Sequence, residues 1–265
     1  FIESDPSPKA IFLNRPHNPT GGVATQQDLG QIEDLVRGSN VAIFSDEPYD
    51  QMVWKGQHHS IFAEPDMADH VVAAYTFSKS FSMSGWRLGF AVANAQTIRL
   101  FETLTNTVIS CVPPFTQAAG VAALTQSRDD RDAMMAAFEE KLIPMVAALN
   151  DIEDVECLSP AGSFYVFPNV KKICNLNNIT SHGLAMYLLE GADTDVGVAC
   201  LGGECFGEAG GGYMRLSSSL AEDKLLAAIS FIKVALSDRP AIGNYLSQHK
   251  HYDLEQPYPL DESAR

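Results

Sequence analysis

The chain has 265 residues, of which 46% are hydrophobic and 19% charged, and its formal net charge is −15. This composition is typical of a globular protein with one large domain or two smaller ones. The acidity argues against nucleic acids and anionic membranes as partners, because both attract basic faces. No apolar run reaches the length of a transmembrane helix.

The first ten residues, FIESDPSPKA, lack the basic and apolar regions of a signal peptide, and they do not begin with Met. We therefore expect a piece of a longer protein. The five cysteines are odd in number and lack CxxC spacing, which predicts a reduced, cytoplasmic protein. His58-His59 and His249-x-His251 have no Cys or carboxylate at ligand spacing, so we expect no metal site.

Short apolar runs alternate with helical patterns in the first half of the chain. The predicted strands are residues 10–14 (AIFLN), 41–49 (VAIFSDEPY), 71–78 (VVAAYTFS) and 89–93 (GFAVA). A helix is predicted from Thr25, its N-cap, to a stop at Gly38. Continuous apolar strands separated by helices predict a parallel sheet that is covered on both faces.

Polar side chains follow the first three predicted strands. Asn18 comes after the first strand, Asp46 and Tyr49 after the second, and Ser78-Lys79 after the third. Ligands of parallel α/β sheets bind beyond the carboxyl ends of the strands. The pattern therefore predicts that these residues share one site.

The second half of the chain predicts a separate α+β module. Residues 97–150 are mostly helical in pattern, and residues 155–170 predict two strands joined by a Pro-Gly turn. The remaining predicted elements are helices at 181–192 and 221–236 and short strands at 197–200 and 211–219. The residues after Pro240 show no clear period.

Lys79 and Arg87 each allow two interpretations from the residues alone. The aromatic neighbours of Lys79 favour a neutral, reactive amine, but a surface lysine can also lay its stem along apolar side chains. Arg87, inside an apolar run, needs an anion. That anion is either a structural carboxylate or a ligand phosphate, which the hydroxyls of Thr76 and Ser78 would suit.

The other candidates are equally open when taken singly. Asp46 can hold a cation or a protonated ring nitrogen, or it can cap the following turn. Tyr49 can direct its hydroxyl at the same site, or it can be an aromatic residue at the rim of the core. Asn18-Pro19-Thr20-Gly21 is a common turn sequence in any protein.

Taken together, four blocks resemble one family. NRPHNPTGG, FSDEPYD, YTFSKSFSMSGWRLGF and YMRLSSS resemble the signature blocks of class I/II aminotransferases, which are pyridoxal-phosphate enzymes of fold type I. The spacing agrees as well: 28 positions from Asn18 to Asp46, three to Tyr49, 30 to Lys79 and eight to Arg87. SPAGSFYVFPNV and GGECFGEAGGG resemble small-domain segments of the family, so the resemblance runs from about residue 9 to about residue 235.

The resemblance implies how the cofactor's ring is held. Lys79 matches the lysine that forms a Schiff base with pyridoxal 5'-phosphate and then moves the substrate's proton. Asp46 matches the carboxylate that keeps the ring nitrogen protonated, and Tyr49 and Asn18 match the partners of the phenolic oxygen. The family also implies a cis peptide bond at Asn18-Pro19.

The resemblance also implies a phosphate site and a substrate site. Arg87, Thr76 and Ser78 match residues that bind the cofactor's phosphate. Arg215 matches the arginine that binds the substrate's α-carboxylate, beside Asn18. The family's first strands, its Gly/Ser-rich phosphate turn and its ring-stacking aromatic residue have no match here, because the resemblance begins near the middle of the family's length.

The implied fold is α/β: a mostly parallel sheet of a large cofactor domain, incomplete at its N-terminal side, plus a smaller α+β domain. We expect the large domain in residues 1–125, the small domain in 126–240 and a polar tail in 241–265. The implied function is amino transfer between an amino acid, of aspartate or aromatic type, and a 2-oxo acid, by a homodimer when full length. A lyase or synthase of the same fold and the sensor domain of a transcription regulator remain alternatives.

Overall fold

The computed structural model describes residue 7, residues 9–64 and residues 66–260. The chain divides into two compact units. Unit 1 comprises the described residues up to Asn18, together with Gly22–Ala136 and Ala161–Ser163. Unit 2 comprises Pro19–Gly21, Ala137–Pro160 and the described residues from Phe164 onward. Within the described part of the chain, no helix combines the length and the apolar character needed to cross a membrane.

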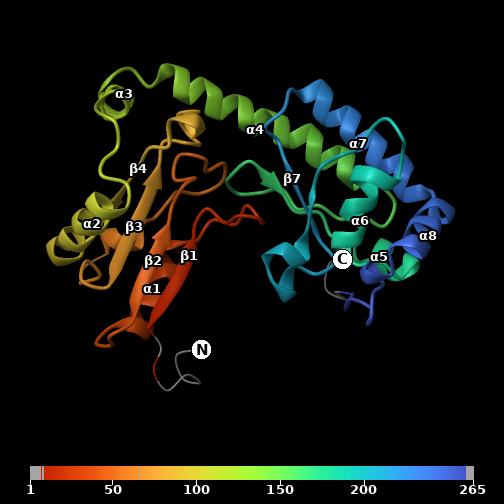
Figure 1. Cartoon of the computed structure of the whole chain (residues 1–265), viewed down its shortest axis with the longest axis horizontal. Coiled ribbons are helices and arrows are strands. Elements are labelled where there is room, and N and C mark those ends of the chain that lie inside the picture. Colours follow the sequence, from red (N-terminus) through yellow and green to blue (C-terminus); the bar gives the residue numbers. More distant parts are fainter. Residues whose placement is uncertain (1–6, 8, 65, 261–265) are drawn as a thin grey trace. The chain divides into compact units, whose positions relative to one another are not determined.

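Unit 1 is built on a four-stranded sheet of order β1-β2-β3-β4 (Figure 1). The strands are β1 (Ala10–Asn14), β2 (Ala42–Asp46), β3 (Val71–Thr76) and β4 (Gly89–Val92). The pairs β1·β2 and β2·β3 are parallel, as the sequence predicts. The carboxyl ends of these three strands therefore meet at one edge of the sheet.

The last strand departs from the parallel pattern, because β4 runs antiparallel to β3. The twelve residues between them, 77–88, contain only a short 3-10 helix, Ser84–Trp86. A parallel pair needs a crossover of a dozen or more residues, usually a helix, whereas an antiparallel pair does not. The sheet is thus mostly parallel, and the α/β fold class is confirmed.

Helix α1 (Gln26–Val36) begins at the capping residue that the sequence predicts. Thr25 is its N-cap, as predicted: its side chain accepts a hydrogen bond from the Asp28 backbone N–H, and the Asp28 side chain accepts one from the Thr25 N–H. This reciprocal capping box satisfies two backbone donors at the helix start. The buried face of α1 packs on the sheet through a core formed by Leu29, Val36, Val41, Ile43, Ile61, Met67, Val71 and Ala73.

Two further helices, α2 (Ala95–Val108) and α3 (Pro114–Thr125), follow β4. Helix α3 lies close to the residues after β3, since a Cβ atom added to Gly120 would lie 2.6 Å from Cδ2 of Leu88. Both helices leave large apolar side chains exposed within unit 1: Leu100, Leu104, Val108, Phe115, Val121 and Leu124. Helix α4 (Asp129–Asn150) continues from unit 1 into unit 2.

Unit 2 combines a small antiparallel sheet with helices. The sheet has the order β5-β7-β6, from β5 (Tyr165–Val166), β6 (Leu201–Gly202) and β7 (Met214–Ser217). Its helices after α4 are α5 (Lys171–Asn177), α6 (Ser181–Met186), which continues as a π-helical turn over Tyr187–Gly191, α7 (Glu222–Ser237) and α8 (Arg239–Gln248). On the part of α4 that belongs to unit 2, helical spacing predicts one apolar face: Leu142, Met145 and Leu149 of that face are buried, and Phe138 is half-buried.

Three expectations for unit 2 differ from the structure. No strand forms at 197–200, because β6 begins at Leu201. In 155–170, the first expected strand is reduced to a single bridge between Glu156 and Asn169. The tail after Pro240 begins with helix α8 rather than irregular chain. Asp238 caps that helix, and Ile242, Tyr245 and Leu246 are buried at helical spacing.

Candidate active site

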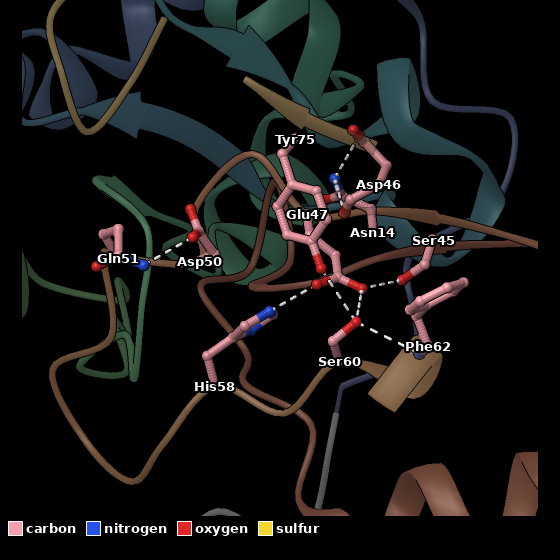
Figure 2. Close-up of polar contacts among 10 residues, drawn as sticks. All are labelled: Asn14, Ser45, Asp46, Glu47, Asp50, Gln51, His58, Ser60, Phe62 and Tyr75. Atoms are coloured by element: carbon pink, nitrogen blue, oxygen red, sulfur yellow. Dashed lines mark hydrogen bonds and ion pairs between the residues drawn. The ribbon is translucent and has the colours of Figure 1, made fainter. Parts of the chain in front are cut away.

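Asp46 is held at the carboxyl edge of the sheet by a residue that the sequence analysis did not single out. Asn14 ends β1 and pairs in register with Asp46 at the end of β2. The Nδ2 atom of Asn14 donates a hydrogen bond of 2.7 Å to Oδ2 of Asp46 (Figure 2). The Asp46 side chain is otherwise exposed, so its carboxylate is fixed in direction and can still accept a further hydrogen bond.

Asn18 is linked to the same group. Its backbone N–H donates a hydrogen bond of 2.6 Å to Oδ1 of Asn14. The side chain of Asn14 therefore connects the turn after β1 to the carboxylate at the end of β2. Among the described residues the cis peptide bond is Arg15–Pro16, so the expectation of a cis bond at Asn18–Pro19 is wrong.

Lys79 and Tyr49 lie together beyond the ends of β3 and β2. The Nζ atom of Lys79 is 5.8 Å from the centroid of the Tyr49 ring, within the range of a cation–π contact. Tyr49 is buried and Lys79 is half-buried. Because β2 and β3 are parallel neighbours, Asp46 and Lys79 come from adjacent strand ends, as the sequence predicts.

The three residues predicted to bind phosphate lie around the end of β3. Oγ1 of Thr76 donates to Oγ of Ser78 at 2.9 Å and accepts from the Ser78 backbone N–H at 3.1 Å. The turn that carries Arg87 is tied to this strand end, since the Phe77 N–H donates to the Leu88 carbonyl at 3.1 Å. Arg87 itself is exposed, has a left-handed backbone (φ 52°) and donates from Nη1 to the Ser84 carbonyl at 2.7 Å.

Arg215 belongs to unit 2, where it lies on β7. Its guanidinium carbon is 4.3 Å from the Tyr165 ring centroid and 5.1 Å from that of Phe206. Arginine stacks well on aromatic faces and keeps its edge donors available when it does so. Two rings thus orient a planar group that is suited to paired hydrogen bonds with a carboxylate.

A second polar group in unit 1 is centred on Glu47, a residue that the sequence analysis did not single out. Its side chain is 2% exposed. Oε1 accepts hydrogen bonds from Ser45 at 2.7 Å and Ser60 at 2.8 Å, and Oε2 lies 2.8 Å from Nε2 of His58. Tyr75 donates to Ser60 at 3.1 Å, which completes the Glu47 network shown in Figure 2.

The Glu47 network keeps a buried carboxylate ionised. Burial by itself raises the pKa of Glu47, but the hydrogen bonds from His58, Ser45 and their neighbours outweigh it and hold the pKa below its usual value. Burial also raises the pKa of Tyr75, so its phenol remains a donor. The network fastens the chain that follows Asp46 to the loop that contains Ser60.

Asn14 and Glu47 leave different traces in the sequence. Asn14 is a polar residue that closes an apolar strand, four positions before Asn18, and that signal could have been read. Glu47 stands next to Asp46, and its partners His58 and Ser60 lie in a loop without a periodic pattern. Only the folded chain brings these side chains together.

Comparison with known proteins is consistent across sequence and structure. The chain matches the family "Aminotransferase class I and II" over residues 2–232. It is 32% identical to an aspartate aminotransferase of Sulfurisphaera tokodaii over 226 residues, which cover 85% of this chain and 55% of that protein. It is 30% identical to aromatic-amino-acid aminotransferase 2 of Thermococcus litoralis, with 89% and 59% covered.

A solved structure agrees with these relatives. The crystal structure of an aromatic aminotransferase from Pyrococcus horikoshii superposes with a TM-score of 0.81 at 30% identity, covering 88% of this chain and 61% of that one. The chain thus spans little more than half the length of the curated relatives that it matches. With the four blocks in place and the family match over most of its length, this chain belongs to the class I and II aminotransferases.

Proposed function

We propose that this chain carries cofactor and substrate residues of a pyridoxal-phosphate-dependent aminotransferase, which moves an amino group from an amino acid to a 2-oxo acid. One observation carries the proposal: Asn14 joins Asp46 and Asn18 at the sheet edge where the Lys79 turn begins. Aspartate or an aromatic amino acid is the proposed donor, because the relatives are named for these substrates. Those names favour transamination over the lyase and sensor alternatives.

The residues present fit the ring of pyridoxal 5'-phosphate in their donor and acceptor chemistry. Asp46, directed by Asn14, would accept a hydrogen bond from the protonated ring nitrogen. Tyr49 and Asn18 would donate to the phenolic oxygen. When bound, the cofactor supplies an electron sink for the charge that develops at the substrate's α-carbon.

Lys79 would bind the cofactor covalently through Nζ. With substrate bound, the Lys79 amine would accept the proton from the substrate's α-carbon and later return it. The Tyr49 ring, 5.8 Å from Nζ, limits the positions that the amine can take. Lys79 is therefore the proposed catalytic residue.

Phosphate and carboxylate would be bound by different groups. Arg87, Thr76 and Ser78 would hold the cofactor's phosphate through a charge and two hydroxyls that lie at one strand end. Arg215 would bind the substrate's α-carboxylate through two parallel hydrogen bonds.

We also propose that the full-length enzyme is a cytoplasmic homodimer. The large apolar side chains that α2 and α3 expose within unit 1 support burial against a partner. The five cysteines are free, which supports a reducing compartment. Sedimentation of the full-length enzyme would test the dimer, and a single monomeric species at micromolar concentration would contradict it.

The proposed reaction is tested by assaying glutamate formation from aspartate or phenylalanine with 2-oxoglutarate. We expect amino transfer that requires the oxo acid, and Arg215→Lys should raise the KM for both substrates about 10- to 100-fold, because a bidentate charged contact is lost. Arg239→Lys, an exposed arginine of unit 2, is the matched control and should leave KM unchanged. Release of ammonia and an oxo acid without added 2-oxoglutarate would instead identify a lyase.

A further inference from the structure

The C-terminal segment 249–260 is docked along unit 2 by specific hydrogen bonds. The Leu254 N–H donates to the Asn178 carbonyl and the Thr180 N–H to the Tyr252 carbonyl, each at 2.9 Å. Near its end, the Tyr258 backbone forms two hydrogen bonds with the Asn175 side-chain amide. The Tyr258 N–H donates to Oδ1 at 2.8 Å, and Nδ2 donates to the Tyr258 carbonyl at 3.0 Å. The family match ends at residue 232, before this segment begins.

Tyr258 reaches from this segment to the loop between β6 and β7. Its hydroxyl donates a hydrogen bond to Oε1 of Glu204, in the 3-10 helix Gly203–Phe206. Glu204 in turn accepts from the Ser181 N–H at 2.9 Å and from the Ser181 hydroxyl at 2.5 Å. Oγ of Ser181 accepts from the Gly212 N–H at 3.1 Å. The side chains of Tyr258, Glu204 and Ser181 thus hold the loop by hydrogen bonds near both of its ends, at Glu204 and at Gly212.

The glycines of the loop allow this close approach. A Cβ atom added to Gly211 would lie 2.8 Å from Cε1 of Tyr258. A Cβ atom added to Gly203 would lie 1.8 Å from the Gly210 carbonyl oxygen. Gly212 has φ +81°, a conformation that suits glycine. The Tyr258 ring therefore packs on loop backbone at positions where a side chain larger than that of glycine would clash.

The loop leads directly to Arg215. Leu201 of β6 pairs in register with Arg215 of β7, and Gly203 donates to the Tyr213 carbonyl at 2.7 Å. Phe206, two positions after Glu204, provides one of the two rings beside the Arg215 guanidinium. A displacement of Glu204 would therefore move both the strand pairing and a ring that orients the arginine.

We propose that segment 249–260 is a brace for the Gly203–Gly212 loop, and that Tyr258 is a positioning residue for carboxylate binding by Arg215. The second part rests on the proposed function of Arg215, whereas the first part stands on the hydrogen bonds alone. The carboxylate ligand is an amino acid or oxo acid.

The brace is tested on the 265-residue chain by Tyr258→Phe, which removes the hydroxyl and keeps the ring. Tyr252→Phe is the matched control, because Tyr252 holds the segment through its backbone carbonyl. We expect amide hydrogen exchange over residues 203–213 to accelerate about 3- to 10-fold in Tyr258→Phe and to stay unchanged in the control, since the variant loses the hydrogen bond to Glu204 and the one that the Ser181 N–H donates to the hydroxyl at 3.2 Å. Unchanged exchange in Tyr258→Phe would overturn the brace.

The link to Arg215 is tested by calorimetric titration with succinate, an unreactive dicarboxylate. We expect Tyr258→Phe to weaken succinate binding about 3- to 10-fold without a comparable change in the unfolding temperature, and Arg215→Ala to abolish it. Unchanged affinity together with faster exchange would overturn the positioning role. Binding in which Arg215→Ala has no effect would refute the proposed function of Arg215 instead, and the exchange data would still decide the brace.

Discussion

Replacing Glu47 by glutamine should destabilise unit 1 at neutral pH, because it removes the charge at the centre of the Glu47 network. The volume is kept, but one acceptor oxygen becomes an NH2 group that faces either the two serines or His58. Losing a hydrogen bond to a charged group costs about 1.5–3 kcal/mol. Glu47→Ala removes the shared acceptor from Ser45, Ser60 and His58, and breaking such a buried charged group costs about 3–5 kcal/mol.

The sign of the pH dependence follows from the lowered pKa of Glu47, whose ordinary value is 4.5. A carboxyl group with a depressed pKa in the folded state adds stability that is fully present above its unfolded pKa, and that stability is lost as the pH falls through the folded pKa. The difference in unfolding free energy between the wild type and Glu47→Gln should therefore be smaller below about pH 4 than at pH 7.

Urea unfolding followed by tryptophan fluorescence measures this difference with probes that lie in unit 1. Both tryptophans of the chain, Trp54 and Trp86, lie in that unit, and the Trp54 indole donates to the Ser163 carbonyl at 2.7 Å. Asp34→Asn, an exposed carboxylate on α1, is the matched control and should change stability by less than about 0.5 kcal/mol. A Glu47→Gln difference that is equal at neutral and acid pH would refute the reasoning.

Three further predictions concern single residues. Asn14→Ala should weaken pyridoxal 5'-phosphate binding about 10-fold in an absorbance titration, because Asp46 loses the amide that directs it; unchanged affinity would mean that Asn14 does not orient the carboxylate. Thr25→Ala should cost about 1 kcal/mol in the same urea assay through the lost cap of α1, and no loss would show that the cap is dispensable. Gly183→Ala should cost about 1–3 kcal/mol of unit 2 stability by circular dichroism, since its Cβ would lie 2.5 Å from Cβ of Tyr252, whereas Gly243→Ala meets no atom within 4 Å and should stabilise α8 by about 0.5–1 kcal/mol. Equal effects of the two alanines would contradict the close packing of the C-terminal segment.

The parts of the fold that local pattern controls could be predicted from the sequence. Strands β1 to β3 are continuous apolar runs, and α1 carries its own capping signal at Thr25. The direction of β4 depends on the length of the connection after Thr76, which the strand pattern does not contain. The residues of α8 are predicted as a polar tail because they show no clear period, yet the proline at position 240 suits the first turn of a helix.

The candidate site likewise contains residues that local sequence pattern identifies and residues that only the folded structure identifies. Asp46 and Lys79 could be found from residue type and position, because the ends of parallel strands gather at one edge. Asn14 needs the register of β1 against β2, and the Glu47 network needs a loop whose path no periodicity predicts. Side chains that act on other side chains are therefore the ones that sequence reasoning misses.

Covalent attachment of the cofactor at Lys79 tests the central proposal most directly. Purified protein is mixed with pyridoxal 5'-phosphate, its visible absorption is recorded, and the adduct is reduced with borohydride and located by peptide mass. We expect a visible band and a modified Lys79, and neither in Lys79→Ala. Modification spread over exposed lysines such as Lys55, with an equal yield in Lys79→Ala, would contradict the assignment.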